Sequence, residues 1–195
     1  MKDSKFELLH CSFVYEPLNI ELKNYLFLNL KEKKKLLEYR NHSSVRSKMI
    51  NDKPITMESH LDFMESLATK NEGYWTLNNE KGTILGTLNL TKYDDETDSF
   101  MGGNFSDPSL IGSGIGLALN YFLHYVAFEK INSSRMRAII KKDNKSAIRL
   151  NQIFGGKKVS SPTIEGEPYI EMVFNREAWY GKVERDVSKY LKYVF

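Results

Sequence analysis

The spacing of apolar residues changes several times along the chain, and each change marks an expected element. An apolar and aromatic segment at 6–16, which ends before Pro17, predicts a first strand. Residues 19–40 carry apolar side chains at helical spacing and predict a helix, continuous or broken. The apolar positions of that helix are Leu22, Tyr25, Leu26, Leu30, Leu36 and Leu37. A second helix is expected after an N-cap at Thr56 or Ser59.

The middle of the chain predicts strands. Segments 73–79 and 82–93 flank a turn-forming sequence and predict a hairpin, and a third strand follows at 99–105. The segment 114–131 is apolar on almost every side, so it predicts a helix buried in the core. The remaining expected elements are a strand at 134–142, a short helix at 144–156, strands at 157–161 and 169–175, and an amphipathic helix at 176–195. This order predicts an α/β (α+β) fold, a mixed and mostly antiparallel sheet flanked by helices, in a single domain over residues 1–195.

The composition is that of an ordinary globular protein, with 41% hydrophobic and 27% charged residues. No apolar run reaches the roughly 18 residues of a membrane-spanning helix, and the N-terminal sequence does not resemble a signal peptide. The net charge of +3 gives no reason to expect nucleic acid, and the lysine-rich segment 31–35 is expected to be a solvated helix face. The single cysteine, Cys11, favours a cytoplasmic location, and we expect it to be a small buried strand residue.

Three glycines precede the buried helix in the stretch Leu-Ile-Gly-Ser-Gly-Ile-Gly at 110–116. The first turn of a helix has unpaired N–H groups and a partial positive charge, and the absence of side chains at Gly112, Gly114 and Gly116 would let a diphosphate approach them. The stretch lacks the lysine of a P-loop and the second half of a dinucleotide-binding fingerprint. Taken alone, it fits tight packing of a helix on a sheet equally well.

Together with the later segment 144–156, this stretch resembles the two cofactor motifs of the GNAT acyltransferase superfamily. The glycines at 112, 114 and 116 match the first motif, although its leading polar residue is absent. In the second motif, Asn144, Ala147, Leu150 and Gly155 match, while Asn151 replaces the usual tyrosine and Gly156 the usual phenylalanine. The resemblance implies acetyl-CoA as cosubstrate. The residues that it implies for cofactor binding are Asn104, Phe105, Gly112, Ser113, Gly114, Ile115, Gly116, Asn144, Ala147 and Asn151.

A second resemblance covers most of residues 36–156. The sequence Arg-Asn-His at 40–42, the spacing of Ile55, His60 and Phe63, and the segment 85–92 are similar to the N-acetyltransferases of pseudaminic acid biosynthesis. Those enzymes acetylate the 4-amino group of a UDP-linked 4-amino-4,6-dideoxy sugar, so the resemblance implies a small-molecule acceptor of that kind. The residues that could contact it are Arg40, His42, Arg46, Met49, Thr91 and Lys92. Surface ion pairs, helix caps and an ordinary strand end are the alternative roles of the polar members of this set.

In the GNAT mechanism the amine attacks the thioester directly, without an acyl-enzyme. The resemblance places the backbone of Met101–Phe105 beside the thioester, so Phe105 would act through its amide. It places the thiolate acid at Asn151, whose amide can donate a hydrogen bond but cannot release a proton. His60 is a candidate proton acceptor, although a helical histidine is more often structural.

No metal is expected, because the four histidines are scattered and no ligand spacing is present. Two other functions remain open at this point. One is a GNAT enzyme for another amine, such as a different amino sugar, an antibiotic or a protein N-terminus. The other is a GNAT-like module that binds CoA without turnover, which the missing hydroxyls at Phe105 and Asn151 would permit. A homodimer is a further expectation, since GNAT proteins often dimerise.

Overall fold

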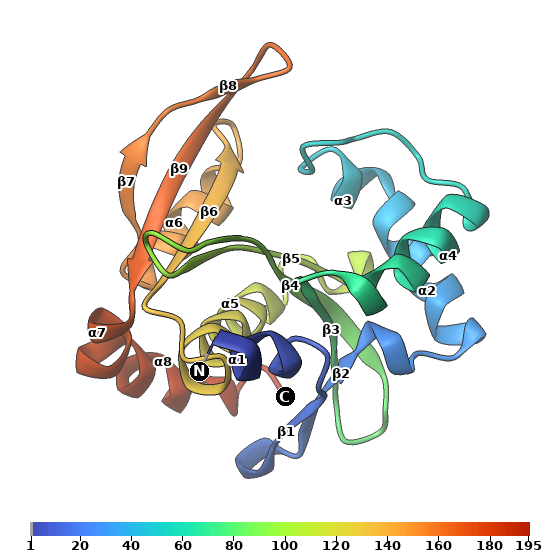
Figure 1. Ribbon diagram of the computed structural model, residues 1–195, viewed down its shortest axis with the longest axis horizontal. Coiled ribbons are helices and arrows are strands. Elements are labelled where there is room, and N and C mark those ends of the chain that lie inside the picture. Colours follow the sequence, from blue (N-terminus) through green and yellow to red (C-terminus); the bar gives the residue numbers. More distant parts are fainter. Residues whose placement is uncertain (1) are drawn as a thin grey trace.

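A mixed sheet with the strand order β1-β2-β3-β4-β5-β6-β9-β7 runs through the protein, and β8 pairs with β9 (Figure 1). The computed structural model describes residues 2–195. Every neighbouring pair of strands is antiparallel except β5 and β6, which are parallel. The strands are β1 (Phe13–Tyr15), β2 (Ile20–Asn24), β3 (Gly73–Asn78), β4 (Ile84–Asp94), β5 (Ser99–Ser106), β6 (Arg135–Lys141), β7 (Lys157–Ser160), β8 (Thr163–Ile164) and β9 (Glu167–Asn175).

Helices cover both faces of the sheet. The α-helices are α1 (Lys2–Leu8), α2 (Leu30–Asn41), α3 (Ser43–Arg46), α4 (Met57–Ser66), α5 (Ile115–Tyr125), α6 (Lys145–Ile153), α7 (Arg176–Ala178) and α8 (Glu184–Leu191). Short 3-10 turns are η1 (Glu16–Leu18), η2 (Tyr25–Phe27), η3 (Leu67–Thr69) and η4 (Pro108–Leu110), and the π-helical turns are η5 (Val126–Lys130) and η6 (Trp179–Val183). No helix of the described chain is both long and apolar enough to cross a membrane.

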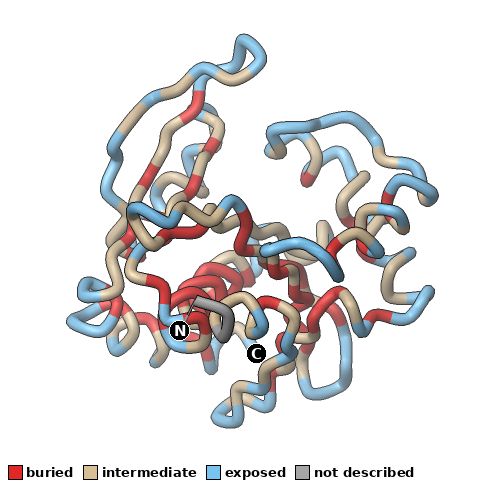
Figure 2. Tube along the Cα trace, in the orientation of Figure 1, coloured by how far each residue is buried: buried red, intermediate tan, exposed pale blue. Residues whose placement is uncertain are grey.

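The two faces of β4 show how the layers are arranged. A Cβ on Gly86 would lie 2.9 Å from Leu119, so this side of β4 faces α5. The next residue, Thr87, bonds to the hydroxyl of Tyr25 on the opposite face, where α2 and α4 pack. Successive strand residues point to opposite faces, so both faces carry an apolar core. The larger core surrounds α5, the buried helix near the centre of Figure 2.

Most expected elements are present, but the N-terminal forty residues differ from the prediction. Residues 6–8 belong to helix α1, and the expected strand is reduced to Phe13–Tyr15. The helix brings Phe6 against the ring of Tyr93, with centroids 5.3 Å apart, and buries Leu9 completely. The expected helix at 19–40 begins as strand β2, because Ile20, Leu22 and Asn24 are buried alternately on one face; only Leu30–Asn41 is α-helical.

Cys11 was expected to be a buried strand residue, and this prediction is wrong. Its side chain is exposed in the turn between α1 and β1. Its Sγ lies 3.6 Å from the carbonyl oxygen of Glu7, a contact typical of a chain leaving a helix. The lysine-rich segment 31–35 lies at the start of α2 and is mostly exposed, as expected.

Candidate active site

Strands β5 and β6 separate along their length and leave a strand edge without a partner. They pair only at residues 99–101 and 135–137. Beyond that point β5 continues to Ser106 paired with β4 alone, and β6 continues to Lys141 paired with β9 alone. The backbone edge of residues 102–106 that faces β6 is therefore open. Unpaired N–H and C=O groups at such an edge can bind an extended, peptide-like ligand.

Two residues of β5 at this separation must be glycines, because neighbouring side chains leave no room for a Cβ on either face of the strand. A Cβ on Gly102 would lie 2.7 Å from the Sδ of Met136, and a Cβ on Gly103 would lie 2.9 Å from Oδ1 of Asn89. Both distances are below ordinary carbon contacts, so a side chain at either position would displace its neighbour. The next two residues, Asn104 and Phe105, continue the open edge, which is where the family resemblance implies that the thioester lies.

The glycine stretch forms the turn that leads from β5 into α5. Gly112 and Gly114 have φ of +90° and +93°, which only glycine adopts without strain, and both are exposed. Gly114 is the N-cap and has no side chain to occupy the helix end, while Ser113 Oγ accepts a long bond of 3.4 Å from the amide of Ile115. The amide of Gly116 has no hydrogen-bond acceptor among the described residues. The N-terminus of α5 thus offers the open donors and the positive dipole that a diphosphate requires.

Helix α6 lies against this end of α5. A Cβ on Gly116 would lie 3.4 Å from Leu150, so the two helices approach closely at that glycine. Asn144 caps α6 by accepting a 3.2 Å bond from the amide of Ala147. The predicted cofactor-binding residues of the two motifs therefore lie on α5 and α6, two helices that are in contact, and in the turns that precede them.

Asn151 is buried in α6 and already bonded within its own helix. Its side-chain Nδ2 donates to the backbone carbonyl oxygen of Ala147 at 2.8 Å, and the backbone carbonyl oxygen of Asn151 accepts from the amide of Gly156 at 3.0 Å. One of the two side-chain N–H groups is therefore in use before any ligand binds. A role for Asn151 beside the leaving thiolate stays a prediction.

Two of the residues predicted to contact the acceptor substrate donate hydrogen bonds to the segment 47–56, which follows α3. Arg40 Nη2 donates to the carbonyl oxygen of Asn51, and Arg46 Nη1 donates to that of Asp52 at 2.9 Å. His42 is the N-cap of α3. The side chains of Arg40 and Arg46 thus bind the backbone of this segment, while the side chain of His42 bonds to Ser44 of α3 instead, and Met49 lies half-buried within the segment.

Two side chains in or beside this segment, Arg40 and Lys48, have further features. The Nη1 of Arg40 is buried and has no hydrogen-bond partner, which is costly for a charged donor. Burial lowers the pKa of Arg40 from its usual value, and the nearby charge of Arg46 lowers it further, although Asp52 opposes both. Lys48, on the same segment, donates to Asp143 at 3.2 Å, which ties the segment to the turn before α6.

Thr91 and Lys92 lie at the closed end of the β5–β6 separation. Thr91 is opposite Met101 in the sheet, and its hydroxyl donates to the Met101 carbonyl at 3.4 Å. Lys92 has a φ of +48° at a bulge, and its carbonyl accepts a 3.1 Å bond from Nη2 of Arg137. Arg137 was not singled out in the sequence, where it is one of two arginines in β6. Its Nε is buried without a partner, at the last position where β6 pairs with β5.

His60 packs against the beginning of α2. Its side chain lies between α4 and α2, and Nε2 is 3.0 Å from the carbonyl oxygen of Lys33. Burial lowers the pKa of His60. The contact gives the ring a structural role, and its use as a proton acceptor stays a prediction. No group of three or more metal-binding side chains occurs in the described residues.

The comparisons with known proteins agree with this geometry. Residues 38–155 match the model of the acetyltransferase (GNAT) family. The chain belongs to that family. Acetyltransferase PseH of Campylobacter jejuni is 29% identical over 133 residues, which cover 68% of this chain and 82% of that protein. The crystal structure of the C. jejuni N-acetyltransferase PseH superposes with a TM-score of 0.65 at 22% identity, covering 80% of this chain and 98% of PseH.

The same fold recurs among other acetyltransferases. A structure of C. jejuni PseH in complex with acetyl coenzyme A gives a TM-score of 0.64 at 21% identity, over 80% of this chain and 99% of that one. Spermidine N-acetyltransferase of Vibrio cholerae, in complex with CoA and spermine, gives 0.74 at 14% identity, over 83% and 98% of the two chains. The protein is thus a GNAT N-acetyltransferase that uses acetyl-CoA, and not a module that binds CoA without turnover.

Proposed function

We propose that the acceptor is the 4-amino group of a UDP-linked 4-amino-4,6-dideoxy sugar, on the way to pseudaminic acid. Two features support this choice: the 29% identity to acetyltransferase PseH over 133 residues and the matching Arg-Asn-His sequence at 40–42. The observation that carries the proposal is the buried, unpartnered Nη1 of Arg40. A nucleoside diphosphate supplies the anionic oxygens that such a donor lacks.

The residues of this chain would contribute to the reaction mainly by positioning the two substrates and by polarising the thioester carbonyl. Acetyl-CoA supplies an activated acetyl group as a thioester. The open backbone edge of residues 102–106 can donate hydrogen bonds to the carbonyl oxygen as it gains negative charge. The acceptor nitrogen forms the new C–N bond, the C–S bond breaks, and the proton lost by the amine and the one gained by the thiolate are exchanged with solvent. No side chain of the chain becomes acylated.

Arg40 and Arg46 would hold the diphosphate, with Thr91 and Lys92 contacting the acceptor or the cofactor. The segment 47–56 would provide the wall on the acceptor side, with Met49 as its apolar contact. The single cysteine and the acetyl-CoA requirement favour a cytoplasmic reaction. A GNAT reaction with another amine is the second candidate, because the acceptor is inferred from moderate sequence identity.

Mass spectrometry of the product tests the acceptor directly. The protein is incubated with acetyl-CoA and UDP-4-amino-4,6-dideoxy-N-acetyl-altrosamine, and the control is the same sugar with its 4-amino group already acetylated. We expect one added acetyl group on the free amine and none on the control. An unchanged sugar, with acetyl-CoA consumed by a polyamine or another amine instead, would overturn this acceptor.

Substitution of Arg40 tests the diphosphate contact. Arg40→Met should raise the KM for the sugar nucleotide by about tenfold or more, because a charge-assisted contact contributes roughly 1.5–3 kcal/mol. The KM for acetyl-CoA should stay the same. Arg135→Met, at an exposed position of β6, is the matched control and should change neither value. Equal effects of the two substitutions would contradict the role of Arg40.

A further inference from the structure

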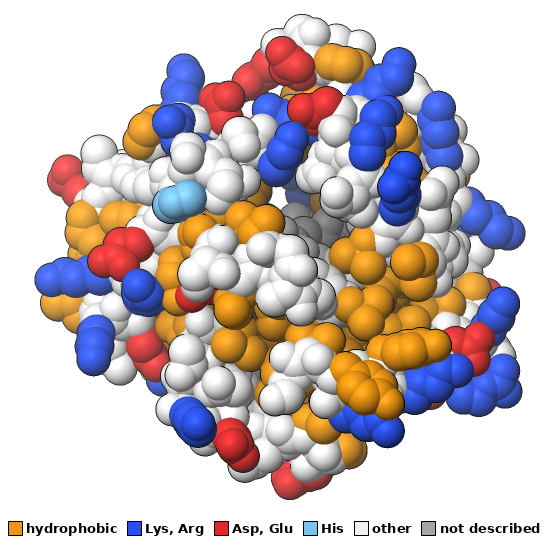
Figure 3. Space-filling view, turned by 180° about the vertical axis from the view of Figure 1, so that it is seen from behind, with side chains coloured by type: hydrophobic (Ala, Val, Ile, Leu, Met, Phe, Trp, Pro, Cys, Tyr) orange, Lys and Arg blue, Asp and Glu red, His pale blue; other side chains and the backbone are white. Residues whose placement is uncertain are grey.

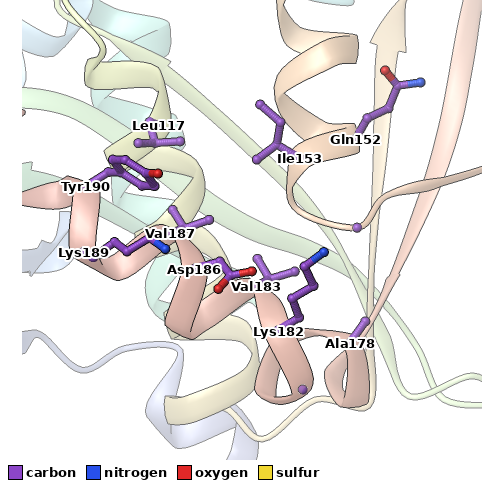
Figure 4. A pocket seen from close by; sticks show the side chains of 12 residues that line it. Leu117, Gln152, Ile153, Ala178, Lys182, Val183, Asp186, Val187, Lys189 and Tyr190 are labelled. Carbon is purple, nitrogen blue, oxygen red and sulfur yellow. The ribbon is translucent and has the colours of Figure 1, made fainter.

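Helix α5 closes one face of the sheet beside the β5–β6 separation. A Cβ on Gly102 would lie 3.2 Å from Leu123 of α5, and Met136 of β6 is completely buried on the same face. Helices α6 and α8 pack against α5 in turn, and side chains of all three helices line the groove that is left between them (Figure 4). An acceptor substrate therefore reaches the separation from the opposite face of the sheet.

The opposite face carries polar side chains at the closed end of the separation. Successive residues of a strand alternate between the faces, so Met101 and Arg137 point away from α5, toward the side where α2 and α4 pack. Thr91 is directly opposite Met101 in the sheet. Asn89 is directly opposite Gly103, and its Oδ1 lies 2.9 Å from the position of a Cβ there. We call Asn89, Thr91 and Arg137 the polar floor.

The guanidinium of Arg137 has a donor without a partner. Its Nη2 donates to the carbonyl oxygen of Lys92 at 3.1 Å, whereas its Nε is buried and has no hydrogen-bond partner among the described residues. The Lys and Arg side chains at the margin of the molecule in Figure 3 extend into solvent, where water can satisfy them. A buried donor without a partner costs free energy, so the position of Nε favours a ligand that supplies a hydrogen-bond acceptor.

We propose that Arg137 is a specificity-determining residue, which together with Asn89 recognises the 2-acetamido group of the sugar. The inference rests on the proposed function and adds the contact that distinguishes this sugar from other 4-amino sugars. Nε–H of Arg137 can donate to the acetamido carbonyl oxygen, and the side-chain oxygen of Asn89 can accept from the acetamido N–H. The two carbons C2 and C4 belong to one six-membered ring, so the acetamido group can lie on the polar floor while the 4-amino group lies at the open edge of β5.

A carbonyl oxygen suits this arrangement better than a phosphate group. Because Nη2 of Arg137 already bonds to Lys92, the two parallel N–H donors of a bidentate phosphate contact are not both free. The registers of Arg137 and Asn89 are two residues apart, about 7 Å along the strands, a span that one sugar ring with its substituents can bridge. The diphosphate at C1 is then left to Arg40 of α2, on the same side of the sheet.

Initial rates with two acceptor substrates isolate the acetamido contact. One is UDP-4-amino-4,6-dideoxy-N-acetyl-altrosamine, and the other is the same sugar nucleotide with a hydroxyl group at C2. The unmodified protein should have a kcat/KM at least about tenfold higher for the first, because the hydrogen bond to the guanidinium is charge-assisted. In Arg137→Met this ratio should fall below about threefold, with the KM for acetyl-CoA unchanged. The matched control is Arg135→Met, the exposed arginine of the same strand, which should keep the ratio.

Two further variants test the hydrogen bonds themselves. Arg137→Lys keeps the positive charge but has no donor at the position of Nε, so the ratio should fall as far as in Arg137→Met. Asn89→Ala should lower the ratio by about threefold, and an unchanged ratio would remove Asn89 from the contact. A ratio that survives in Arg137→Met, or that lysine restores, would overturn the proposal. An equal loss with both acceptor substrates would also overturn it, because that loss would place Arg137 on the diphosphate that they share.

Failure of the proposed function gives a different result from failure of this inference. Thermal unfolding verifies that each variant is folded. If the unmodified protein acetylates the two sugar nucleotides equally well, only the acetamido contact is wrong. If it acetylates neither of them and acts on another amine, the proposed acceptor and the acetamido contact both fail.

Discussion

His124 provides the most direct test of how the buried core responds to pH. The ring is 1% exposed and lies among Phe154, Phe174 and Trp179, with ring centres 4.9, 4.7 and 5.7 Å away. Its Nδ1 is 2.8 Å from the carbonyl oxygen of Asn120, so the neutral ring donates there, and Nε2 is buried without a partner. A protonated Nε2 would place an unpaired charge in this apolar site.

The magnitude follows from the pKa. Burial lowers the pKa of His124 from 6.5 to about 4, against the smaller opposing effect of the bond to Asn120. The unfolded chain therefore takes up a proton at a higher pH than the folded one. The stabilisation is complete above pH 6.5 and is lost as the pH falls to about 4. At about 1.4 kcal/mol per pH unit, the loss reaches about 3 kcal/mol in the free energy of unfolding.

Urea unfolding at several pH values, followed by tryptophan fluorescence, measures this effect. The variant His124→Asn keeps a donor for Asn120 but does not titrate, so it should be less stable than the unmodified protein at pH 7 because the ring volume is lost. The difference between the two proteins should shrink by about 2–3 kcal/mol between pH 7 and pH 4. A difference that stays constant over this range would refute the reasoning, whatever other groups titrate.

Three further predictions concern the glycine turn, the exposed thiol and the segment before α5. Gly114→Ala should weaken acetyl-CoA binding in calorimetry and cost about 1 kcal/mol of stability, whereas Gly82→Ala, at a φ of +71° in open space, should cost stability alone. Equal binding by both variants would count against the turn. Cys11 should react with a thiol reagent in the folded protein without loss of acetyl transfer, and labelling that requires denaturant would contradict its exposure. Tyr39→Phe removes the 2.6 Å bond to Asp107 and should lower the free energy of unfolding by about 1–2 kcal/mol; an unchanged urea midpoint would show that the bond contributes nothing.

The sequence predicts the second half of the chain well because local signals and tertiary packing agree there. Helix α5 is apolar on nearly every side, as a helix in the centre of a core must be, and its glycines need the positive φ that the structure shows at 112 and 114. Asn144 is an N-cap by residue type and by geometry. In these segments no long-range contact opposes the local preference.

The first forty residues were predicted less well because periodicity alone does not separate the alternatives there. In β2, Leu22 fits both a helical spacing and strict alternation with Ile20 and Asn24, and pairing with β3 decides for the strand. Leu8 and Leu9 are adjacent apolar residues, which a strand buried on one face cannot place together but a helix and its turn can. Such decisions depend on the partner strand, which local sequence does not contain.

The site shows the same division between local and long-range information. The glycines and Asn144 are readable from the sequence because the backbone of one short segment gives them their role. The unpartnered donors of Arg40 and Arg137 are not, because each becomes buried only when distant segments meet. Asn151 lies between these cases: its position was predictable, but its bond to Ala147 was not. Because that bond occupies one of its N–H groups, and an amide releases no proton, the proton that reaches the leaving thiolate must come from solvent or from another group.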